Sequence, residues 1–405
     1  MRVTTVFRRL VGVTELLVQR VLFEDRGLVL EARPRWRKPR CGECGRAGPI
    51  YDISPPRFWR HLNFGENRCW IRYAPRRVNC RDCGVKIEAV PWAARGSRFT
   101  YDFEELVAYL AQVMDRTAVT KQVGIAWQTV GTIVSRIVRE RLDPKRLDGV
   151  RRIGIDEFSY RKRHSYVTIV VDHDQKRVIW AGEGKSADAL KGFFEELGEE
   201  GRALIKTVTI DMSPAYRRAV NEWLPNAEIV YDRFHVQRLV SDAVDEVRRA
   251  EVRDCGEEDR AKAIKGSRYA LLKRDWNLTT RDLAKLSEIQ KTNQRLYRAY
   301  LLKDALIDVL DDRNPDELRH RLRAWLSWAS RSKLKPMVKV ARTIRAHFEG
   351  VVAYAHERLT NGVVEGMNTR MRMVARRAYG FHSARALIAM MFLCLGGIQL
   401  HPPLP

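Results

Sequence analysis

The sequence contains no apolar stretch long enough to cross a membrane. Its longest apolar run, from Ala386 to Leu400, is shorter than the ~20 residues that a spanning helix needs. Charged residues at Arg8, Arg9 and Glu15 interrupt the N-terminal segment, which therefore lacks the apolar core of a secretory signal. Internal repeats and low-complexity tracts are also missing. These absences exclude membrane-spanning and secreted classes and predict a cytoplasmic protein.

Acidic residues are fewer than basic residues in this sequence. The 50 Asp and Glu residues are outnumbered by 74 Lys and Arg, which gives a formal net charge of +24 and a pI near 10.0. Such an excess favours polyanionic partners, of which nucleic acids are the commonest. A hydrophobic content of 45% excludes a disordered basic tail, and 405 residues predict two or three domains. A ribosome-associated or merely soluble basic protein remains the plain alternative.

Cysteine is scarce, and its distribution is uneven. Four of the seven cysteines form two CxxC pairs, each followed by glycine: Cys41, Cys44, Cys80 and Cys83. Four thiolates complete the tetrahedral shell of a structural zinc ion, and disulfides are rare in cytosolic proteins, whose thiols are kept reduced. The pairs therefore predict a structural Zn²⁺ site. Cys69, in the strand-like RCWIRYAP, is expected to be a core residue, and Cys255 and Cys394 have no metal partner at a useful spacing.

Residues 98–149 show the pattern of a helix-turn-helix. Apolar residues recur at helical spacing in FEELVAYLAQVMDR, and Gly124 separates two further helical segments. The second of these would present six residues outward to DNA: Trp127, Gln128, Thr132, Ser135, Arg136 and Arg139. A helical hairpin buried in a core would show the same periodicity.

From residue 150 the pattern changes to short strands. RRIGIDEFSY, HSYVTIVVDHD and KRVIWAGEGK predict three strands, and two helices alternate with two more strands after them. The order βββαβαβ is that of a ribonuclease-H-like domain, in which a mixed sheet carries carboxylates at strand ends. Asp156 lies on the first strand and Asp211 at the end of the fourth. Those strands are neighbours in that fold, so we expect the two carboxylates to meet.

Residues 238–355 are helical in pattern throughout, with charged residues between Leu, Ala and Trp. They separate Asp211 from Glu365, which lies in a further helical segment. Four arginines on that segment are predicted to meet phosphate, unless they are simply solvated: Arg370, Arg372, Arg376 and Arg377.

Several of these motifs together resemble the ISL3 family of insertion-sequence transposases, which use DDE chemistry. The resemblance covers essentially the whole chain and includes both cysteine knuckles, the helix-turn-helix and GIDEFSYRKRHSYVTIVVD. The most specific segments are TIDMSPAYRRAV, YDRFHVQRLVSDAVDEVRR and TNGVVEGMNTRMRMVARRAYGFHS.

This resemblance implies that Asp156, Asp211 and Glu365 are the metal-binding carboxylates. Two Mg²⁺ ions, which Mn²⁺ can replace, would activate a water or 3′-hydroxyl and stabilise the leaving oxygen. The implied activity is cleavage of double-stranded DNA at terminal inverted repeats, followed by strand transfer to target DNA. The implied setting is the bacterial cytoplasm and nucleoid, with a homodimer or higher homo-oligomer holding two element ends.

Three assignments keep an alternative. Glu157 competes with Asp156, because adjacent strand residues face opposite sides. Glu357 competes with Glu365, whose helix is expected to start at Thr360 and Asn361. His235, in an Asp-x-x-His motif, either takes part in the site or packs against Asp232.

The predicted fold class is therefore α+β and multidomain, with a ribonuclease-H-like α/β catalytic domain, an all-helical insertion, an N-terminal zinc-binding module and a helix-turn-helix. The expected division is 1–97 (zinc-binding region), 98–149 (helix-turn-helix), 150–237 (catalytic, first part), 238–355 (helical insertion) and 356–405 (catalytic, C-terminal helices). The rival functions are a catalytically silent DNA-binding regulator and a structure-selective nuclease of the same fold.

Overall fold

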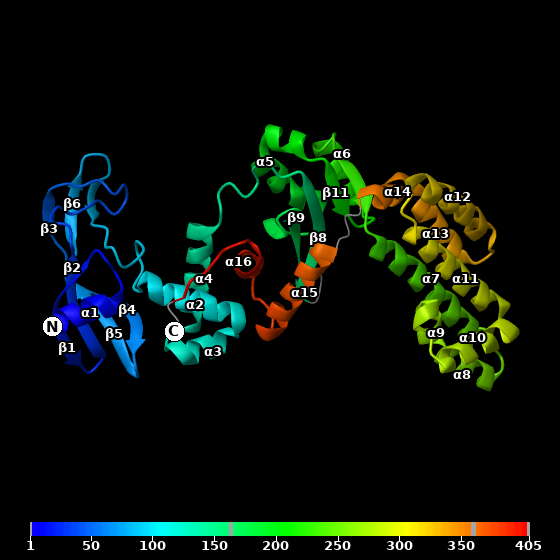
Figure 1. Ribbon diagram of the computed structural model, residues 1–405, viewed down its shortest axis with the longest axis horizontal. Coiled ribbons are helices and arrows are strands. Elements are labelled where there is room, and N and C mark those ends of the chain that lie inside the picture. Colours follow the sequence, from blue (N-terminus) through cyan, green and yellow to red (C-terminus); the bar gives the residue numbers. More distant parts are fainter. Residues whose placement is uncertain (1, 162–164, 358–361, 403–405) are drawn as a thin grey trace. The chain divides into compact units, whose positions relative to one another are not determined.

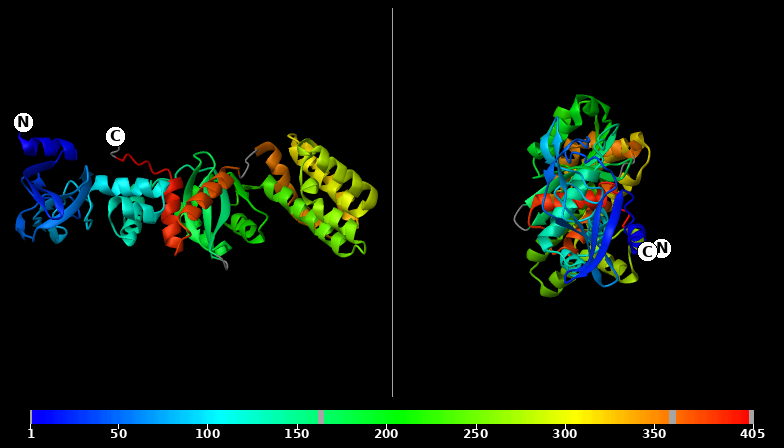
Figure 2. Two further views of the ribbon diagram at one scale, coloured as in Figure 1. Left: turned by 90° about the horizontal axis from the view of Figure 1, so that it is seen from below. Right: turned by 90° about the vertical axis from the view of Figure 1, so that its left-hand side faces the viewer.

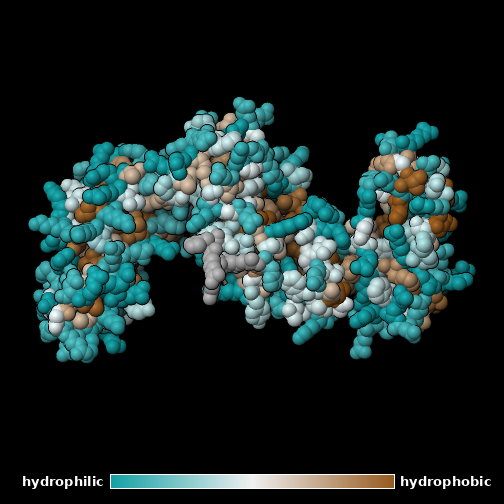
Figure 3. Space-filling model, turned by 180° about the vertical axis from the view of Figure 1, so that it is seen from behind, coloured by the Kyte–Doolittle hydropathy of each residue, from teal (hydrophilic) through white to brown (hydrophobic). Residues whose placement is uncertain are grey.

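The computed structural model describes residues 2–161, 165–357 and 362–402 (Figure 1). The chain forms two compact units, one of residues 1–142 with 398–405 and one of residues 143–397. No helix in these described ranges is both long and apolar enough to cross a membrane. Hydrophilic side chains cover most of the face shown in Figure 3, in keeping with a charged fraction of 31%.

The first unit starts with a helix and a four-stranded sheet of order β1-β2-β5-β4. The elements are α1 (Val3–Val11), β1 (Leu16–Glu24), β2 (Gly27–Pro34), β4 (Arg57–Phe64) and β5 (Asn67–Tyr73). Trp59, Ile71 and Trp92 are buried in its core. Gly27 has a φ of 112°, and a Cβ there would lie 2.4 Å from the carbonyl oxygen of Arg68. Glycine therefore allows β2 to pass closely beside β5.

A smaller antiparallel sheet carries the cysteine pairs. It has the order β3-β6-β7 and consists of β3 (Ile50–Ile53), β6 (Arg76–Cys80) and β7 (Gly84–Ile87). Cys80 ends β6 and pairs with Gly84 across the β6–β7 turn, while Cys41 forms an isolated bridge with Glu88. The sheet register therefore brings the two CxxC turns together from segments far apart in sequence.

Three helices complete the first unit: α2 (Tyr101–Val113), α3 (Arg116–Val123) and α4 (Trp127–Arg141). Thr100 and Asp115 cap α2 and α3 by accepting from backbone N–H groups in the first turn. Gly124 ends α3 in the left-handed region, with φ of 68°, and starts the turn to α4. The predicted helix-turn-helix is confirmed, and the apolar stripe of α4 is buried.

The second unit contains a five-stranded mixed sheet of order β10-β9-β8-β11-β12. In chain order its elements are β8 (Arg152–Arg161), β9 (Ser165–Asp172), β10 (Arg177–Glu183), α5 (Ala187–Leu204), β11 (Thr207–Ile210), α6 (Pro214–Trp223) and β12 (Glu228–Tyr231). The predicted order βββαβαβ is confirmed. The first three strands are antiparallel, and β11 is parallel to both β8 and β12.

After β12 the chain forms a group of helices, which lies to one side of the sheet (Figures 1 and 2). They are α7 (Arg233–Arg253), α8 (Glu258–Gly266), α9 (Arg268–Leu272), the 3₁₀ turn η1 (Asp275–Asn277), α10 (Thr280–Thr292), α11 (Gln294–Asp311), α12 (Pro315–Arg331), α13 (Lys335–Ala346) and α14 (Phe348–Glu357). Gly350 lets α14 pack on β12, because a Cβ there would lie 2.5 Å from the Tyr231 ring. One hydrophobic core continues from the sheet into these helices.

The last two helices, α15 (Gly362–Arg377) and α16 (Ala384–Leu395), return to the sheet. α15 lies against β8 (Figure 1). The contact depends on Gly154, where a Cβ would lie 2.5 Å from the Cγ2 atom of Val364. Thr360 and Asn361, the expected start of this helix, lie outside the described residues.

Candidate functional site

The four cysteines of the CxxC pairs converge on one point. Their sulfur atoms all lie within 4.8 Å of one another. Backbone N–H groups near Cys80 hold the pKa of its thiol down, at about 7, which favours the thiolate form that binds metal. Four sulfur donors at this spacing fit a structural zinc ion.

The face of α4 that the sequence predicted for DNA is exposed over most of its length. Trp127, Gln128, Thr132 and Arg139 are exposed, and Ser135 is half-buried. Arg136 does not match the outward placement expected for it. Its guanidinium forms an ion pair with the carboxylate of buried Glu104 on α2, and only 14% of the Arg136 side chain is exposed. The ion pair turns Arg136 inward, toward the α2–α4 contact.

The second unit holds an acidic cavity of about 360 Å³ at the sheet. Asp156 comes from β8, Asp211 follows directly after β11, and Glu365 lies on the first turn of α15. β8 and β11 are parallel neighbours, with Gly154 paired to Thr209, so Asp156 and Asp211 lie at the same end of adjacent strands. The structure therefore brings these three sequence-predicted carboxylates to one cavity.

Asp156 is held from two sides. Its Oδ1 atom accepts from the backbone N–H of Glu157 at 2.7 Å, and its Oδ2 atom accepts from Nδ2 of Asn368 at 2.6 Å. Burial raises the pKa of Asp156, and the nearby carboxylates of Asp211 and Asp232 raise it further. Asp211 accepts from the backbone N–H of Ser213 at 2.9 Å.

Asp232 and His235 form a pair on the cavity wall. Asp232 is 2% exposed and caps α7 by accepting from the backbone N–H of Phe234. Its other oxygen lies 3.2 Å from Nδ1 of His235, and this hydrogen bond raises the pKa of the imidazole. His235 thus both packs against Asp232 and lines the cavity. In this geometry, packing against Asp232 does not prevent His235 from taking part in the site.

Other acidic and basic candidates differ in their placement. Glu157 lines the cavity beside Asp156, and burial raises its pKa. The side chain of Glu357 lies outside the described residues. Among the α15 arginines, Arg372 lines the cavity, Arg370 and Arg376 are exposed, and Arg377 is half-buried.

Three carboxylates of the cavity form no ion pair with a described lysine or arginine, although His235, Arg238 and Arg372 also line it. Within the described ranges, Asp156, Asp211 and Glu365 form no ion pair with lysine or arginine, although the chain carries a net charge of +24. Three carboxylates that face one space repel each other unless a cation or a proton neutralises them. Oxygen donors of this kind suit Mg²⁺. Of the side chains described, the four cysteines alone bring three or more metal-ligand atoms within 4.8 Å of one another, so the carboxylates are arranged more openly.

A zinc-binding module, a helix-turn-helix and an acidic cavity in one basic chain define an enzyme that acts on DNA. Residues 153–391 match the transposase profile of the ISL3 family, and residues 88–138 match the helix-turn-helix domain of transposase family ISL3. Residues 37–83 match the zinc finger of the transposases of IS204, IS1001, IS1096 and IS1165.

Full-length relatives agree with these matches. The chain is 38% identical to the transposase for insertion sequence element IS1557 of Mycobacterium tuberculosis, over 100% of this chain and 98% of that protein. It is 30% identical to the transposase for IS1001 of Bordetella parapertussis, over 88% and 89% of the two chains. The chain therefore belongs to the ISL3 family of insertion-sequence transposases. Its zinc finger and helix-turn-helix are those of a DNA-binding transposase.

Proposed function

We propose that this transposase cleaves and joins DNA through a ribonuclease-H-like domain whose metal ligands are Asp156, Asp211 and Glu365. The observation that carries the proposal is the single cavity lined by these three carboxylates, none of them neutralised by a lysine or arginine in the described ranges. The mixed sheet, with two parallel pairs around β11 and helices between them, supports the fold assignment. Asp156, Asp211 and Glu365 would hold divalent Mg²⁺, or Mn²⁺ in its place, which would supply positive charge to activate a nucleophile and to stabilise the leaving oxygen.

The protein's own residues orient this site. Asn368 fixes one oxygen of Asp156 by its hydrogen bond, which leaves the carboxylate little freedom to rotate. The cavity wall also carries His235, whose pKa is raised by its hydrogen bond to Asp232. The imidazole of His235 and the guanidinium of Arg372 are suited to holding a scissile phosphate against the carboxylates. Cleavage at an element end exposes the 3′-hydroxyl that attacks target DNA.

DNA recognition is assigned to the first unit. The exposed residues of α4, including Gln128, Thr132 and Arg139, face the bases and phosphates of the terminal inverted repeats. The exposed α15 arginines, Arg370 and Arg376, contact phosphate near the cut. Because two element ends must be held together, we propose a homodimer or larger homo-oligomer during the reaction. The functional division remains 1–97, 98–149, 150–237, 238–355 and 356–405, with the fourth part an all-helical insertion.

Single isosteric substitutions test the assignment. Asp156→Asn, Asp211→Asn and Glu365→Gln are each expected to abolish Mg²⁺-dependent strand cleavage while the protein still binds element ends. Glu199→Gln, an exposed acidic residue of α5 outside the cavity, serves as the matched control. Cleavage that survives substitution of any of the three would remove that residue from the proposed ligand set.

The same assay separates the rival functions. A silent regulator binds ends without cutting them at any metal concentration. A structure-selective nuclease cuts branched DNA whatever its sequence and joins no strands. The two full-length relatives named as transposases favour strand transfer.

A further inference from the structure

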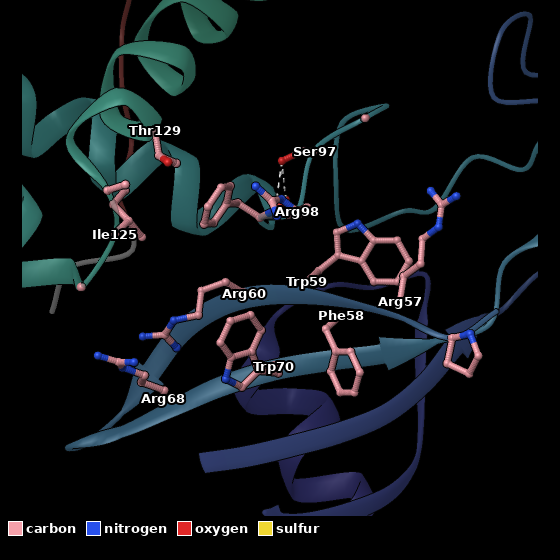
Figure 4. Close-up of a pocket in the computed structure, with 15 residues that line it drawn as sticks. Arg57, Phe58, Trp59, Arg60, Arg68, Trp70, Ser97, Arg98, Ile125 and Thr129 are labelled. Carbon is pink, nitrogen blue, oxygen red and sulfur yellow. Dashed lines mark hydrogen bonds between the residues drawn. The ribbon is translucent and has the colours of Figure 1, made fainter. Parts of the chain in front are cut away.

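A second cavity lies in the first unit, between strands β4 and β5 and the turn that begins α4 (Figure 4). Its volume is about 650 Å³, within the range of ~300–1,000 Å³ typical of ligand sites. In Figure 4 the strands supply Arg60, Arg68 and Trp70, while Arg98 and Thr129 come from the opposite wall. This cavity is separate from the acidic cavity of the second unit.

Arginine is the sole charged residue type in the lining. Arg57, Arg60, Arg68 and Arg98 all line the cavity, and no aspartate or glutamate does. Across the described ranges, none of the four forms an ion pair. Arg72, two residues after Trp70 on the same strand, is by contrast paired with both Glu24 and Glu31. Unneutralised arginines gathered in one space favour a bound anion.

Arg60 adds a buried charge to the cavity floor. Its side chain is almost fully buried, and its guanidinium donates to the carbonyl oxygens of His61 at 3.1 Å and Cys69 at 3.2 Å. Burial and the neighbouring Arg68 lower the pKa of Arg60 to about 10, so it stays charged at neutral pH. A buried cation without a carboxylate partner raises the positive potential of the cavity, because few solvent molecules screen it.

Arg68 connects the sheet to the helix-turn-helix. Its Nη2 atom lies 3.1 Å from the position that a Cβ on Gly124 would occupy, so the guanidinium packs against the turn between α3 and α4. Helix α4 begins there with Ala126 as N-cap, which gives no side-chain capping bond. The N–H of Thr129 donates to the carbonyl oxygen of Ala126 at 2.9 Å, and the positive end of the helix dipole at this start favours an anion.

We propose that this cavity binds the phosphodiester backbone of the DNA strand that passes the start of α4. Arg68 and Arg98 pair with its phosphates, and the Trp70 side chain packs against an adjoining deoxyribose. The inference rests on the proposed function, since it assumes that α4 reads the terminal repeats. It extends that function by making the N-terminal sheet, as well as the helix-turn-helix, part of the DNA-binding surface.

The test compares two double variants of the full-length protein with equal loss of charge. Arg68→Ala/Arg98→Ala removes exposed arginines of the cavity, and Arg8→Ala/Arg9→Ala removes exposed arginines of α1 outside it. Affinity for terminal-repeat duplex is measured from 50 to 200 mM salt, with hydroxyl-radical footprinting of the bound DNA. The cavity variant is expected to bind the duplex at least about tenfold more weakly. The slope of log affinity against log salt concentration should also become shallower by about 2, because two phosphate contacts are lost. Its footprint should shrink at one edge only.

The control variant should keep the complete footprint, and thermal unfolding should show both variants folded. Equal affinity loss and equal footprints for the two variants would overturn the proposal, because general charge would then explain the effect. So would tighter binding of a free nucleoside monophosphate than of duplex DNA, which would indicate a small nucleotide ligand. Wild-type end binding and cleavage test the proposed function separately, since neither depends on the outcome for the cavity variant.

Discussion

Asn368 and Asp156 are 212 residues apart in the sequence and are joined by a hydrogen bond of 2.6 Å. The amide is 3% exposed, and its Oδ1 atom has no partner among the described side chains and backbone. The single bond from Nδ2 therefore fixes the orientation of the Asn368 amide. It also ties α15 to β8 at the acidic cavity, next to the Gly154–Val364 contact.

We expect Asn368→Ala to slow single-turnover strand cleavage. A hydrogen bond to a charged group is worth roughly 1.5–3 kcal/mol, which corresponds to about a 10- to 150-fold loss. End binding should stay unchanged, because the proposal assigns end recognition to the first unit and Asn368 is buried in the second. Asn368→Asp should be slower still, since its carboxylate repels Asp156. Thr369→Ala, at the exposed neighbouring position, is the control. Cleavage by Asn368→Ala at the wild-type rate would show that Asn368 does not position Asp156.

Removing a zinc ligand should disturb the small sheet. Cys80→Ser is expected to lose bound zinc and to weaken end binding, because the β6–β7 turn then has no metal to fix it. Metal analysis of the purified protein measures the loss directly. Cys255→Ser, a thiol outside the cluster, should retain full zinc content. A Cys80→Ser protein with wild-type zinc content would contradict the four-cysteine site.

Arg136 and Arg139 should behave differently although both lie on α4. Arg136→Ala leaves buried Glu104 without its cation and should destabilise the first unit by about 3–5 kcal/mol. Arg139→Ala should change stability by less than about 0.5 kcal/mol but weaken DNA binding. Chemical unfolding and end-binding titrations separate the two effects. Adding Glu104→Gln to Arg136→Ala should restore part of the stability; no restoration would argue against the ion pair.

Buried Lys303 should make the stability of the folded chain depend on pH in the alkaline range. The ammonium is buried and donates to the carbonyl oxygens of Leu271 at 3.0 Å and Lys273 at 2.8 Å. Burial lowers its pKa from 10.5 to about 8. Between pH 8 and 10.5 the unfolded chain holds this proton while the folded chain releases it, so stability should rise with pH across that window.

Urea unfolding at several pH values measures this rise. Lys303→Met should flatten it, at the cost of leaving two carbonyl groups unpaired. Lys291→Met, an exposed lysine of α10, should leave the slope unchanged. Asp304 and Asp275 oppose the lowering of the Lys303 pKa and Arg274 adds to it, so their substitution should move the window. A flat wild-type profile would show that Lys303 stays protonated in the folded chain.

The order of helices and strands could be predicted because it follows from local hydrophobic patterns in the sequence. Short apolar runs bounded by turn residues marked β8 to β12, and the stripe of Val130, Ile133 and Ile137 marked α4. The meeting of Asp156 and Asp211 followed from strand adjacency. The zinc site could be predicted equally well, because the CxxC spacing of its ligands is local within each cysteine pair.

Side-chain partners were harder to predict, because they depend on contacts between distant segments. Arg136 lies 32 residues from Glu104, and nothing in the helical periodicity distinguishes it from exposed Arg139. The cavity at Arg68 and Trp70 had only a weak signal, the mixture of aromatic and basic residues in RFWRHLNFGENRCWIRY. Strand register decides which of those residues share a face, and sequence alone left that register open.

The position of Glu365 has a consequence for the timing of synthesis. The strands of the zinc-binding region, the helix-turn-helix and both aspartates leave the ribosome before α15 is made. On the proposed assignment, a nascent chain can dock on an element end before it is able to cut. A chain that terminates within the long helical region would retain the first unit's strands and helices without the third carboxylate. Premature termination would thus convert a cutting enzyme into a competitor for the same DNA ends.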